Sequence, residues 1–191
     1  MTTINTSNKQ LDDVLKEVWK DLVDGVSSAR NPFHTPAVSS LGTEGPEVRT
    51  VVLRGADPGE RELFFHTDAR SPKYAQLQAD PRLEWMFYDR ERKIQLRARG
   101  HCTVHREDNI ALQRWQDTSD NSRWCYTSSE GPGTPIETAD AVQHEDEGYV
   151  NFVAVRCRIE RLDWLYLRAG GHLRCQFLWV GDSWDGQWVA P

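Results

Sequence analysis

The stretch RTVVLRGADPGERELFFHTDARSPK, residues 49–73, carries the signals that decide the fold. Its apolar runs at residues 51–53 and 63–65 are separated by a segment rich in glycine and proline, a pattern typical of a β-hairpin. Ser71 and Pro72 then suit the N-cap and the first position of a helix. The sequence therefore predicts strand, turn, strand and helix in that order.

The start of this predicted helix has the chemistry of an anion site. Free amides of the first turn, the Ser71 hydroxyl and the Lys73 ammonium can converge on a phosphate. Arg49 adds a permanent charge with bidentate geometry from the neighbouring strand. Ser-Pro is also an ordinary way to begin a helix, so the pattern alone leaves a phosphate site and plain capping both open.

Composition favours one soluble domain over residues 1–191, long enough to bury a core without disulfides. A net charge of −6 argues against a nucleic-acid partner. The N-terminal residues form no apolar run suited to a signal peptide or membrane span, so we expect a cytoplasmic protein without membrane attachment. No C-x-x-C pair occurs, and Cys102, Cys125, Cys157 and Cys175 are expected to be reduced thiols.

Residues 1–30 are predicted to hold a long N-terminal helix. Apolar residues recur there at three- and four-residue steps, and Ser7 with Gln10 resembles a capping box. The periodic positions are Leu11, Val14, Leu15, Val18, Trp19, Leu22, Val23 and Val26. Such a helix buries one face against the rest of the domain.

Most of the remaining chain is predicted as strand. Between Lys93 and His105 small or apolar residues alternate with polar ones, which indicates an antiparallel sheet or small barrel with one polar face. His101 and His105 would lie about 13 Å apart along such a strand. Ligands of one zinc ion sit about 2 Å from it, so no metal site is expected.

Further strands are predicted at residues 37–41, 83–88, 149–159, 162–167 and 177–180. Asp185-Gly186 is predicted as a turn between two strands. Residues 117–148, rich in Ser, Thr, Gly, Pro and acidic residues, are predicted to form a long loop, and loops of this length are often functional.

Taken together, these residues resemble the pyridoxamine 5'-phosphate oxidase-like, FMN-binding split barrels. RTVVLR is similar to that family's R-x-V-x-L-[KR] flavin strand, and a glutamine five residues before Gly100 matches its next strand. The other similar positions are His66, Thr67, Arg70, Ser71, Lys73 and Gln95. The resemblance runs from about residue 30 to the closing WVAP.

The resemblance implies a mainly β (α+β) fold: a six-stranded antiparallel split β-barrel of Greek-key type with a long N-terminal helix and short peripheral helices. It further implies a homodimer with FMN in each cleft between subunits, and a small-molecule substrate or electron donor. The cofactor-binding residues that it implies are Arg49, Thr50, Val51, Val52, Leu53, Arg54, His66, Thr67, Arg70, Ser71, Lys73, Gln95, Ser128 and Ser129.

The resemblance also assigns roles. Arg49, Ser71 and Lys73 would hold the phosphate, the main chain of residues 50–53 would lie beside the isoalloxazine, and Gln95 would hydrogen-bond the flavin. Along one strand Arg49 and Arg54 would be about 16 Å apart, which suits one at each end of an extended FMN. Ser128 and Ser129 would lie where the partner subunit reaches across.

The substrate end of the site departs from the family pattern. Residues 172–176 read HLRCQ where pyridoxamine phosphate oxidases have Arg-x-His-x-Arg, and Pro72 replaces an arginine. An imidazole cannot supply the permanent bidentate charge of a guanidinium, so a substrate other than a vitamin B6 phosphate is expected. Arg123, His172 and Arg174 are the candidate substrate residues. No catalytic acid or base stands out.

The sequence thus favours an FMN-dependent oxidoreductase, in which the flavin carries the electron chemistry and the protein orients it. Two other classes stay open. One is a flavin-binding carrier or sensor without turnover, and the other is a barrel that has lost its cofactor and serves as a structural dimer.

Overall fold

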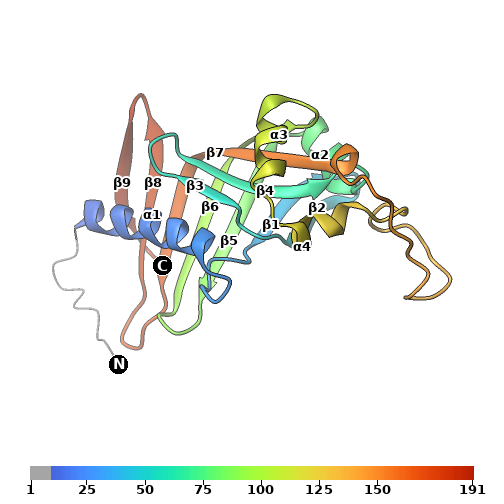
Figure 1. Ribbon diagram of the computed structural model, residues 1–191. Helices are drawn as coiled ribbons and strands as arrows, with labels where there is room; N and C mark the ends of the chain where they lie inside the picture. The colour runs from blue at the N-terminus through green and yellow to red at the C-terminus, as the bar shows by residue number, and fades with distance from the viewer. Residues whose placement is uncertain (1–9) are drawn as a thin grey trace.

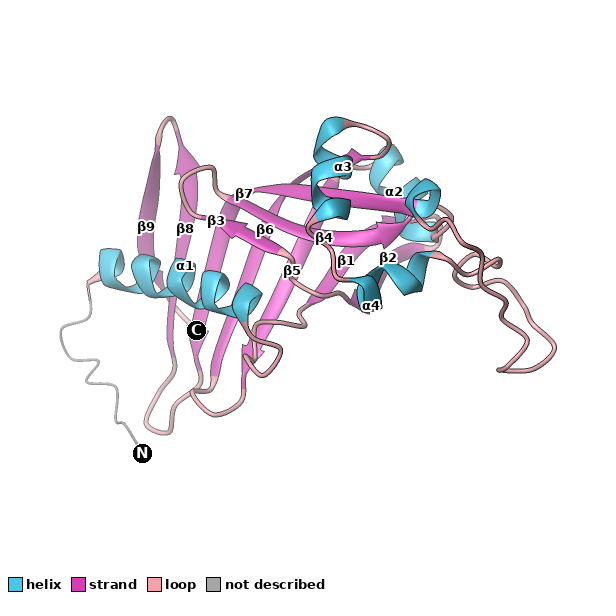
Figure 2. Cartoon of the chain, in the orientation of Figure 1, coloured by secondary structure: helices cyan, strands magenta, loops and turns pink. Residues whose placement is uncertain are grey.

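The computed structural model describes residues 10–191, which form a nine-stranded antiparallel sheet with helices around it (Figures 1 and 2). The helices are α1 (Leu11–Ser27), α2 (Pro72–Ala79), α3 (Asn109–Gln116) and α4 (Asp120–Arg123), with 3-10 turns at Trp124–Tyr126 and Tyr149–Asn151. The strands are β1 (Ala37–Gly42), β2 (Gly45–Thr50), β3 (Gly55–Asp57), β4 (Glu62–Asp68), β5 (Arg82–Asp89), β6 (Ile94–His105), β7 (Phe152–Tyr166), β8 (Leu173–Val180) and β9 (Ser183–Val189).

The predicted N-terminal helix is present as α1, whose N-cap is Gln10. The capping role predicted for Ser7 lies outside the described residues. The helix buries Val14, Val18 and Leu22 and contacts β3 and β9 at one end of the sheet (Figure 1). None of the described helices is long and apolar enough to cross a membrane.

The sheet closes on itself through the stretch at residues 49–73. Its strands follow the order β2-β1-β5-β6-β7-β4-β3, so β2 and β3 lie at opposite ends of the path. Only residues 51–54 join these two strands, and so short a link spans at most about 17 Å. The two ends of the sheet must therefore approach each other, which confirms the predicted barrel, with nine strands where six were expected.

RTVVLR is not one continuous strand, so that part of the prediction was wrong. β2 ends at Thr50, and the next residues leave the ladder to cross the barrel. The amides of Val51 and Leu53 donate to the carbonyls of Pro36 and His34, while the Arg54 amide donates to Phe64. The predicted turn also begins later, because Gly55–Asp57 pairs with β4 as β3.

The barrel is split at β7, a strand of 15 residues. β6 lies along one edge of β7, whereas the other edge is shared: residues 152–158 pair with β4 and residues 161–166 pair with β8. The Arg61 side chain lies where β4 ends and β8 begins along this edge of β7. Its Nη1 donates to the Ile159 carbonyl at 2.7 Å, and its guanidinium lies 3.9 Å from the Trp179 ring centroid.

Two predicted breaks in the strands were wrong. The expected gap after Ile159 is a bulge, since the register with β6 shifts between Arg99 and Gly100 and the ladder continues to Tyr166. Asp185-Gly186 lies inside β9 rather than at a turn. Gly186 faces Phe177, whose ring a Cβ at position 186 would approach to 2.8 Å, so close packing explains this glycine.

Two apolar clusters lie on the two sides of β4 and β7. The larger one fills the barrel, where Trp85 and Phe87 stack at 5.9 Å and Phe65 meets Trp85 edge-on. The smaller one lies under α3 and the segment after α4. There the rings of Trp115 and Phe152 are 5.2 Å apart. This second cluster positions much of the candidate site.

Residues 117–148 form the predicted loop, apart from α4, one 3-10 turn and a single bridge between Ser128 and His144. The part after Ser128 projects from the barrel as a yellow-to-orange arm (Figure 1).

Candidate functional site

The centre of the candidate site is the junction of β4 and α2. The Ser71 hydroxyl makes no capping bond to α2 and instead lies 3.1 Å from the Thr67 hydroxyl. Lys73 Nζ donates to the same Thr67 oxygen at 3.2 Å. Thr67 and Ser71 are buried. Pro72 has no amide and the Tyr74 amide donates to the Ser71 carbonyl, so the Lys73 amide is the one in the first turn without a backbone partner in the described chain. Two hydroxyls, one ammonium and one free amide therefore meet at the start of α2.

Arg49 lies on the barrel-facing side of β2, opposite the buried Val38, and reaches α2. Its Nη2 donates to Gln76 Oε1 at 3.1 Å and to Glu47 Oε2 at 2.9 Å. Its Nη1 donates to the hydroxyl of the buried Ser40, which itself donates to Gln76. We refer to Arg49, Thr67, Ser71 and Lys73 as the α2 cradle.

The cradle holds two cations, Lys73 and Arg49, and Arg49 is paired with Glu47. Arg49 bonds Gln76, one turn along α2 from Lys73. Burial lowers the pKa of Lys73 and the charge of Arg49 lowers it further, whereas the charge of Asp68 acts in the other direction. Within residues 10–191, Lys73 has no ion pair with a carboxylate. An anion with two or more oxygens would offset both charges at once. The residues present therefore fit a phosphate group.

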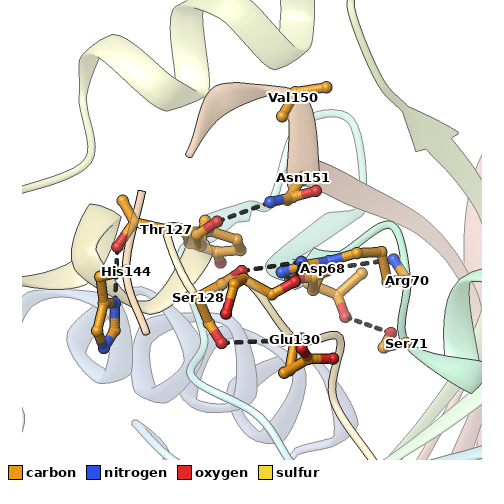
Figure 3. Close-up of polar contacts among 12 residues, drawn as sticks. Asp68, Arg70, Ser71, Thr127, Ser128, Glu130, His144, Val150 and Asn151 are labelled. Carbon is orange, nitrogen blue, oxygen red and sulfur yellow. Dashed lines mark hydrogen bonds and ion pairs between the residues drawn. The ribbon is translucent and has the colours of Figure 1, made fainter. Parts of the chain in front are cut away.

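Arg70 is next to the cradle but is engaged within the chain. Its Nε and Nη2 donate to both oxygens of Asp68, at 3.0 and 2.8 Å. Its Nη1 donates to the carbonyls of Ser128 and Ser129, at 2.9 and 3.1 Å (Figure 3). The structure thus places Ser128 and Ser129 beside the end of β4, with Arg70 as the tie between them.

The base of the arm has further anchors. Thr127 Oγ1 lies 2.9 Å from His144 Nδ1, and Asn151 donates to the Tyr126 carbonyl at 2.9 Å (Figure 3). The His144 ring also stacks on Trp124 at 4.1 Å. The arm is therefore fixed at its base beside the cradle.

The link at residues 50–53 offers little free backbone. The amides of Val51 and Leu53 are already bonded, whereas the Val52 amide donates to no backbone carbonyl of the described chain. Leu53 is buried, and Val51 and Val52 are half-buried. Of the three amides at residues 51–53, that of Val52 is the one without a backbone partner in the described chain.

His66 lies in the second apolar cluster, with its ring 4.7 Å from that of Phe152. Its Nε2 is buried and has no hydrogen-bond partner among the described residues. Burial lowers the pKa of His66 to about 3, and the nearby charges of Arg54 and Arg114 contribute to this shift. The imidazole is therefore neutral at physiological pH.

Arg54 and Arg114 border a groove between α1, β3 and α3. Arg54 Nη2 donates to the Ser122 hydroxyl at 3.1 Å, and Arg114 lies 4.0 Å from the Phe64 ring centroid. Neither guanidinium has an ion pair with a carboxylate in the part of the chain that is described. Arg114 and Ser122 were not among the predicted site residues, because only the packing of α3 and α4 over β4 brings them there.

Gln95 and Arg174 lie on the outer face of the sheet. They share a row across β6, β7 and β8, since Gln95 is opposite Leu165 and Leu165 is opposite Arg174. Arg174 makes two bonds to Asp163, at 2.9 and 2.7 Å. Burial acts to raise the pKa of Asp163, but bonds from Arg174 and Gln176 outweigh it and the pKa lies below its usual value.

The other two candidate substrate residues have no contact with the cradle. Arg123 closes the C-terminus of α3 by donating to the carbonyls of Trp115 and Gln116, at 3.1 and 2.9 Å. His172 is exposed in the loop between β7 and β8. Within one chain, the cradle therefore lies on the barrel-facing side of the sheet, whereas Gln95 and Arg174 lie on its outer face.

Known proteins share both the local pattern and the whole fold. Residues 16–106 match the family model of the pyridoxamine 5'-phosphate oxidase FMN-binding domain. A pyridoxamine 5'-phosphate oxidase-related, FMN-binding protein from Nostoc punctiforme is similar at 24% identity and a TM-score of 0.78, over 92% of this chain and 97% of that one.

Two further solved structures share the fold. PhzG from Burkholderia lata, solved with tetrahydrophenazine-1-carboxylic acid, is 17% identical with a TM-score of 0.72, over 97% of this chain and 95% of that one. A general stress protein 26-related protein from Clostridium acetobutylicum is 15% identical with a TM-score of 0.57, over 85% and 94%. The chain thus has a match to the pyridoxamine 5'-phosphate oxidase FMN-binding domain at residues 16–106 and shares its split-barrel fold with these pyridoxamine 5'-phosphate oxidase-like structures.

Proposed function

We propose that two copies of this chain bind FMN between them and use it in an oxidoreductase reaction on a small molecule. The observation that carries the proposal is the α2 cradle, where Lys73 and Arg49 lie close together beside two buried hydroxyls. Lys73 has no carboxylate partner among residues 10–191. A phosphate ester suits this arrangement better than ordinary helix capping does, because the Ser71 hydroxyl does not cap α2.

In this proposal the cradle binds the FMN phosphate and the Val52 amide is available to the ring. Bound FMN would supply the redox chemistry, by accepting electrons from one molecule and passing them to another. The chain itself binds and orients the cofactor. The neutral His66 and the second apolar cluster exclude water on the side facing α3.

The homodimer is part of the proposal, because one chain cannot bring Gln95 and the cradle to the same flavin. They lie on opposite faces of the sheet, so a flavin that contacts both takes Gln95 from a second copy. Large apolar side chains are exposed on the same outer face, as expected of a surface that pairs. They are Leu41, Val48, Met86, Tyr88, Leu178 and Val180.

The proposed substrate class follows from the two guanidiniums that border the groove between α1, β3 and α3. Arg54 and Arg114 have no carboxylate partner in the described chain, and burial lowers the pKa of Arg114. A substrate with a carboxylate or phosphate group would stabilise both guanidiniums. Because Arg123 and Arg174 are engaged elsewhere, the proposal does not extend to oxidation of a vitamin B6 phosphate.

A flavin carrier or sensor without turnover is the second candidate. The observation in its favour is that two of the three expected substrate residues, Arg123 and Arg174, make internal bonds. Anaerobic titration of the flavin-loaded protein with NADH and NADPH, followed by oxygen, separates the two. Reduction and reoxidation would support the enzyme, whereas a flavin that resists both donors would favour the carrier.

Two variants, expressed alone and together, test whether one FMN site takes residues from both copies of the chain. Lys73→Met damages the cradle and Gln95→Ala damages the opposite half. If FMN lies between copies, co-expression yields dimers in which about a quarter of all sites are intact and bind FMN with wild-type affinity. If all the contacts come from one copy, every site keeps one defect and no wild-type affinity returns. A wild-type protein that is colourless and takes up no added FMN would refute the proposal as a whole.

A further inference from the structure

Glu47 is the carboxylate that occupies Arg49 in the cradle. The two residues are two apart on β2, so their side chains point to the same side of the edge strand. Glu47 Oε2 accepts from Arg49 Nη2 at 2.9 Å, and the Glu47 carbonyl accepts from Nη1 at 3.0 Å. The carboxylate lies directly over Gly42, where a Cβ would overlap it.

The terminal donors of Arg49 are fully used in this arrangement. Nη1 bonds Ser40 and the Glu47 carbonyl, while Nη2 bonds Gln76 and the Glu47 carboxylate. A phosphate that takes a bidentate contact from this guanidinium must therefore replace an existing partner. Ser40 is 3% exposed, whereas the Glu47 side chain is 51% exposed.

The two cations of the cradle thus differ in their partners. Arg49 has a charged partner that can turn into solvent at little cost, while Lys73 has only the Thr67 hydroxyl within residues 10–191. A carboxylate and a phosphate repel each other and compete for the same donors. Glu47 is therefore the partner that an incoming phosphate displaces.

We infer that Glu47 is an internal competitor of the phosphate: it holds Arg49 in place when the cradle has no ligand and lowers the affinity for phosphate-bearing ligands. The inference rests on the proposed function, because it assigns the cradle to a phosphate. Glu47 would thus be a specificity-determining residue that the sequence did not indicate. Its effect is confined to ligands that carry the phosphate, since a ligand without one does not compete for Arg49.

Glu47→Gln tests the inference, because it removes the charge and keeps an amide oxygen to accept from Arg49. Titrations with FMN and with riboflavin, which has no phosphate, are followed by fluorescence. We expect Glu47→Gln to bind FMN about two- to tenfold more tightly than the wild type and riboflavin with unchanged affinity. Unchanged or weaker FMN binding in Glu47→Gln would overturn the inference.

Glu44→Gln is the matched control, because Glu44 lies with Glu47 along a groove between the β1–β2 turn and α2 and carries the same charge without a bond to Arg49. It should change FMN affinity less than Glu47→Gln does, and equal gains in both variants would show a general charge effect and overturn the inference. Inorganic phosphate provides a second probe if wild-type protein binds no FMN, a result that refutes the proposed function alone. Phosphate should then raise the thermal midpoint more in Glu47→Gln than in the wild type, and equal shifts would refute the role of Glu47.

Discussion

Lys73→Met should weaken FMN binding and leave the ligand-free protein as stable as before, or more so. The substitution keeps the length and apolar stem of the side chain and removes the ammonium. In the ligand-free cradle that ammonium is partly buried, lies near Arg49 and has a neutral hydroxyl as its partner. Asp68 attracts this ammonium, but burial and the repulsion from Arg49 outweigh that attraction, so the charge is unfavourable on balance until an anion binds.

The size of the loss in FMN affinity follows from the charged hydrogen bond that the Lys73 ammonium would donate to a bound phosphate. Losing one charged hydrogen bond costs about 1.5–3 kcal/mol, which corresponds to a rise in Kd of about 10- to 150-fold. In the ligand-free protein, removing the repulsion from Arg49 and the cost of burial should change the free energy of unfolding by 0 to about +1 kcal/mol. Lys73→Met should therefore weaken FMN binding while leaving the ligand-free protein as stable as the wild type or more so.

FMN titration by fluorescence and urea unfolding without ligand measure the two quantities separately. Lys16→Met, on the exposed side of α1, is the matched control and should leave both unchanged. Wild-type FMN affinity in Lys73→Met would show that the phosphate lies elsewhere. A clear loss of stability in the ligand-free variant would refute the electrostatic reasoning.

Three further substitutions test the rest of the site and its frame. His66→Gln should make the stability of the protein less sensitive to acid. The neutral His66 contributes stability above pH 6.5 that is lost as pH falls toward 3. Between pH 7.5 and 5.5, the free energy of unfolding in urea should therefore fall by about 1 kcal/mol more in the wild type than in the variant. Gly100→Ala should destabilise the protein by about 2–4 kcal/mol, because its Cβ would overlap the Arg158 carbonyl at the bulge. Arg70→Lys should make residues 129–143 more sensitive to limited proteolysis, since an ammonium cannot reproduce the fork that joins the arm to β4.

Each of these three predictions has a control variant or a result that would contradict it. Equal pH dependence in wild type and His66→Gln would mean that another group sets the acid sensitivity. Gly59→Ala should be nearly neutral, because its nearest neighbour would be an Asp57 oxygen at 3.3 Å, and a similar loss at both glycines would argue against the bulge. Arg90→Lys, at an exposed position, is the control and should leave proteolysis of the arm unchanged. Unchanged proteolysis in Arg70→Lys would show that other contacts fix the arm.

The parts of the fold that the sequence predicted well have a local cause. Alternation from Lys93 to His105 needs no distant contact to indicate a half-buried strand, and β6 runs from Ile94 to His105. The breaks predicted after Ile159 and at Asp185-Gly186 depended on turn-like residues. There the bulge and the ring of Phe177, both set by neighbouring strands, decide the structure.

The same distinction applies to the site. Thr67, Ser71 and Lys73 are close in sequence, so the helix start alone brings them together. The pairing of Arg54 with Ser122 depends on how the helices pack and has no local signal. A sequence also cannot tell a guanidinium that faces a ligand from one that bonds a carboxylate, as Arg174 does. The cytoplasmic location stays a prediction.

The forked edge of β7 gives the chain two halves that can change separately. The first half of β7 supports β4 and, through it, the cradle, whereas the second half supports the β8–β9 hairpin. Neither β8 nor β9 pairs with β4, so we expect substitutions in that hairpin to leave the β4 ladder intact. A protein built this way can acquire a new outer surface, and with it a new substrate or partner, while the α2 cradle remains unchanged.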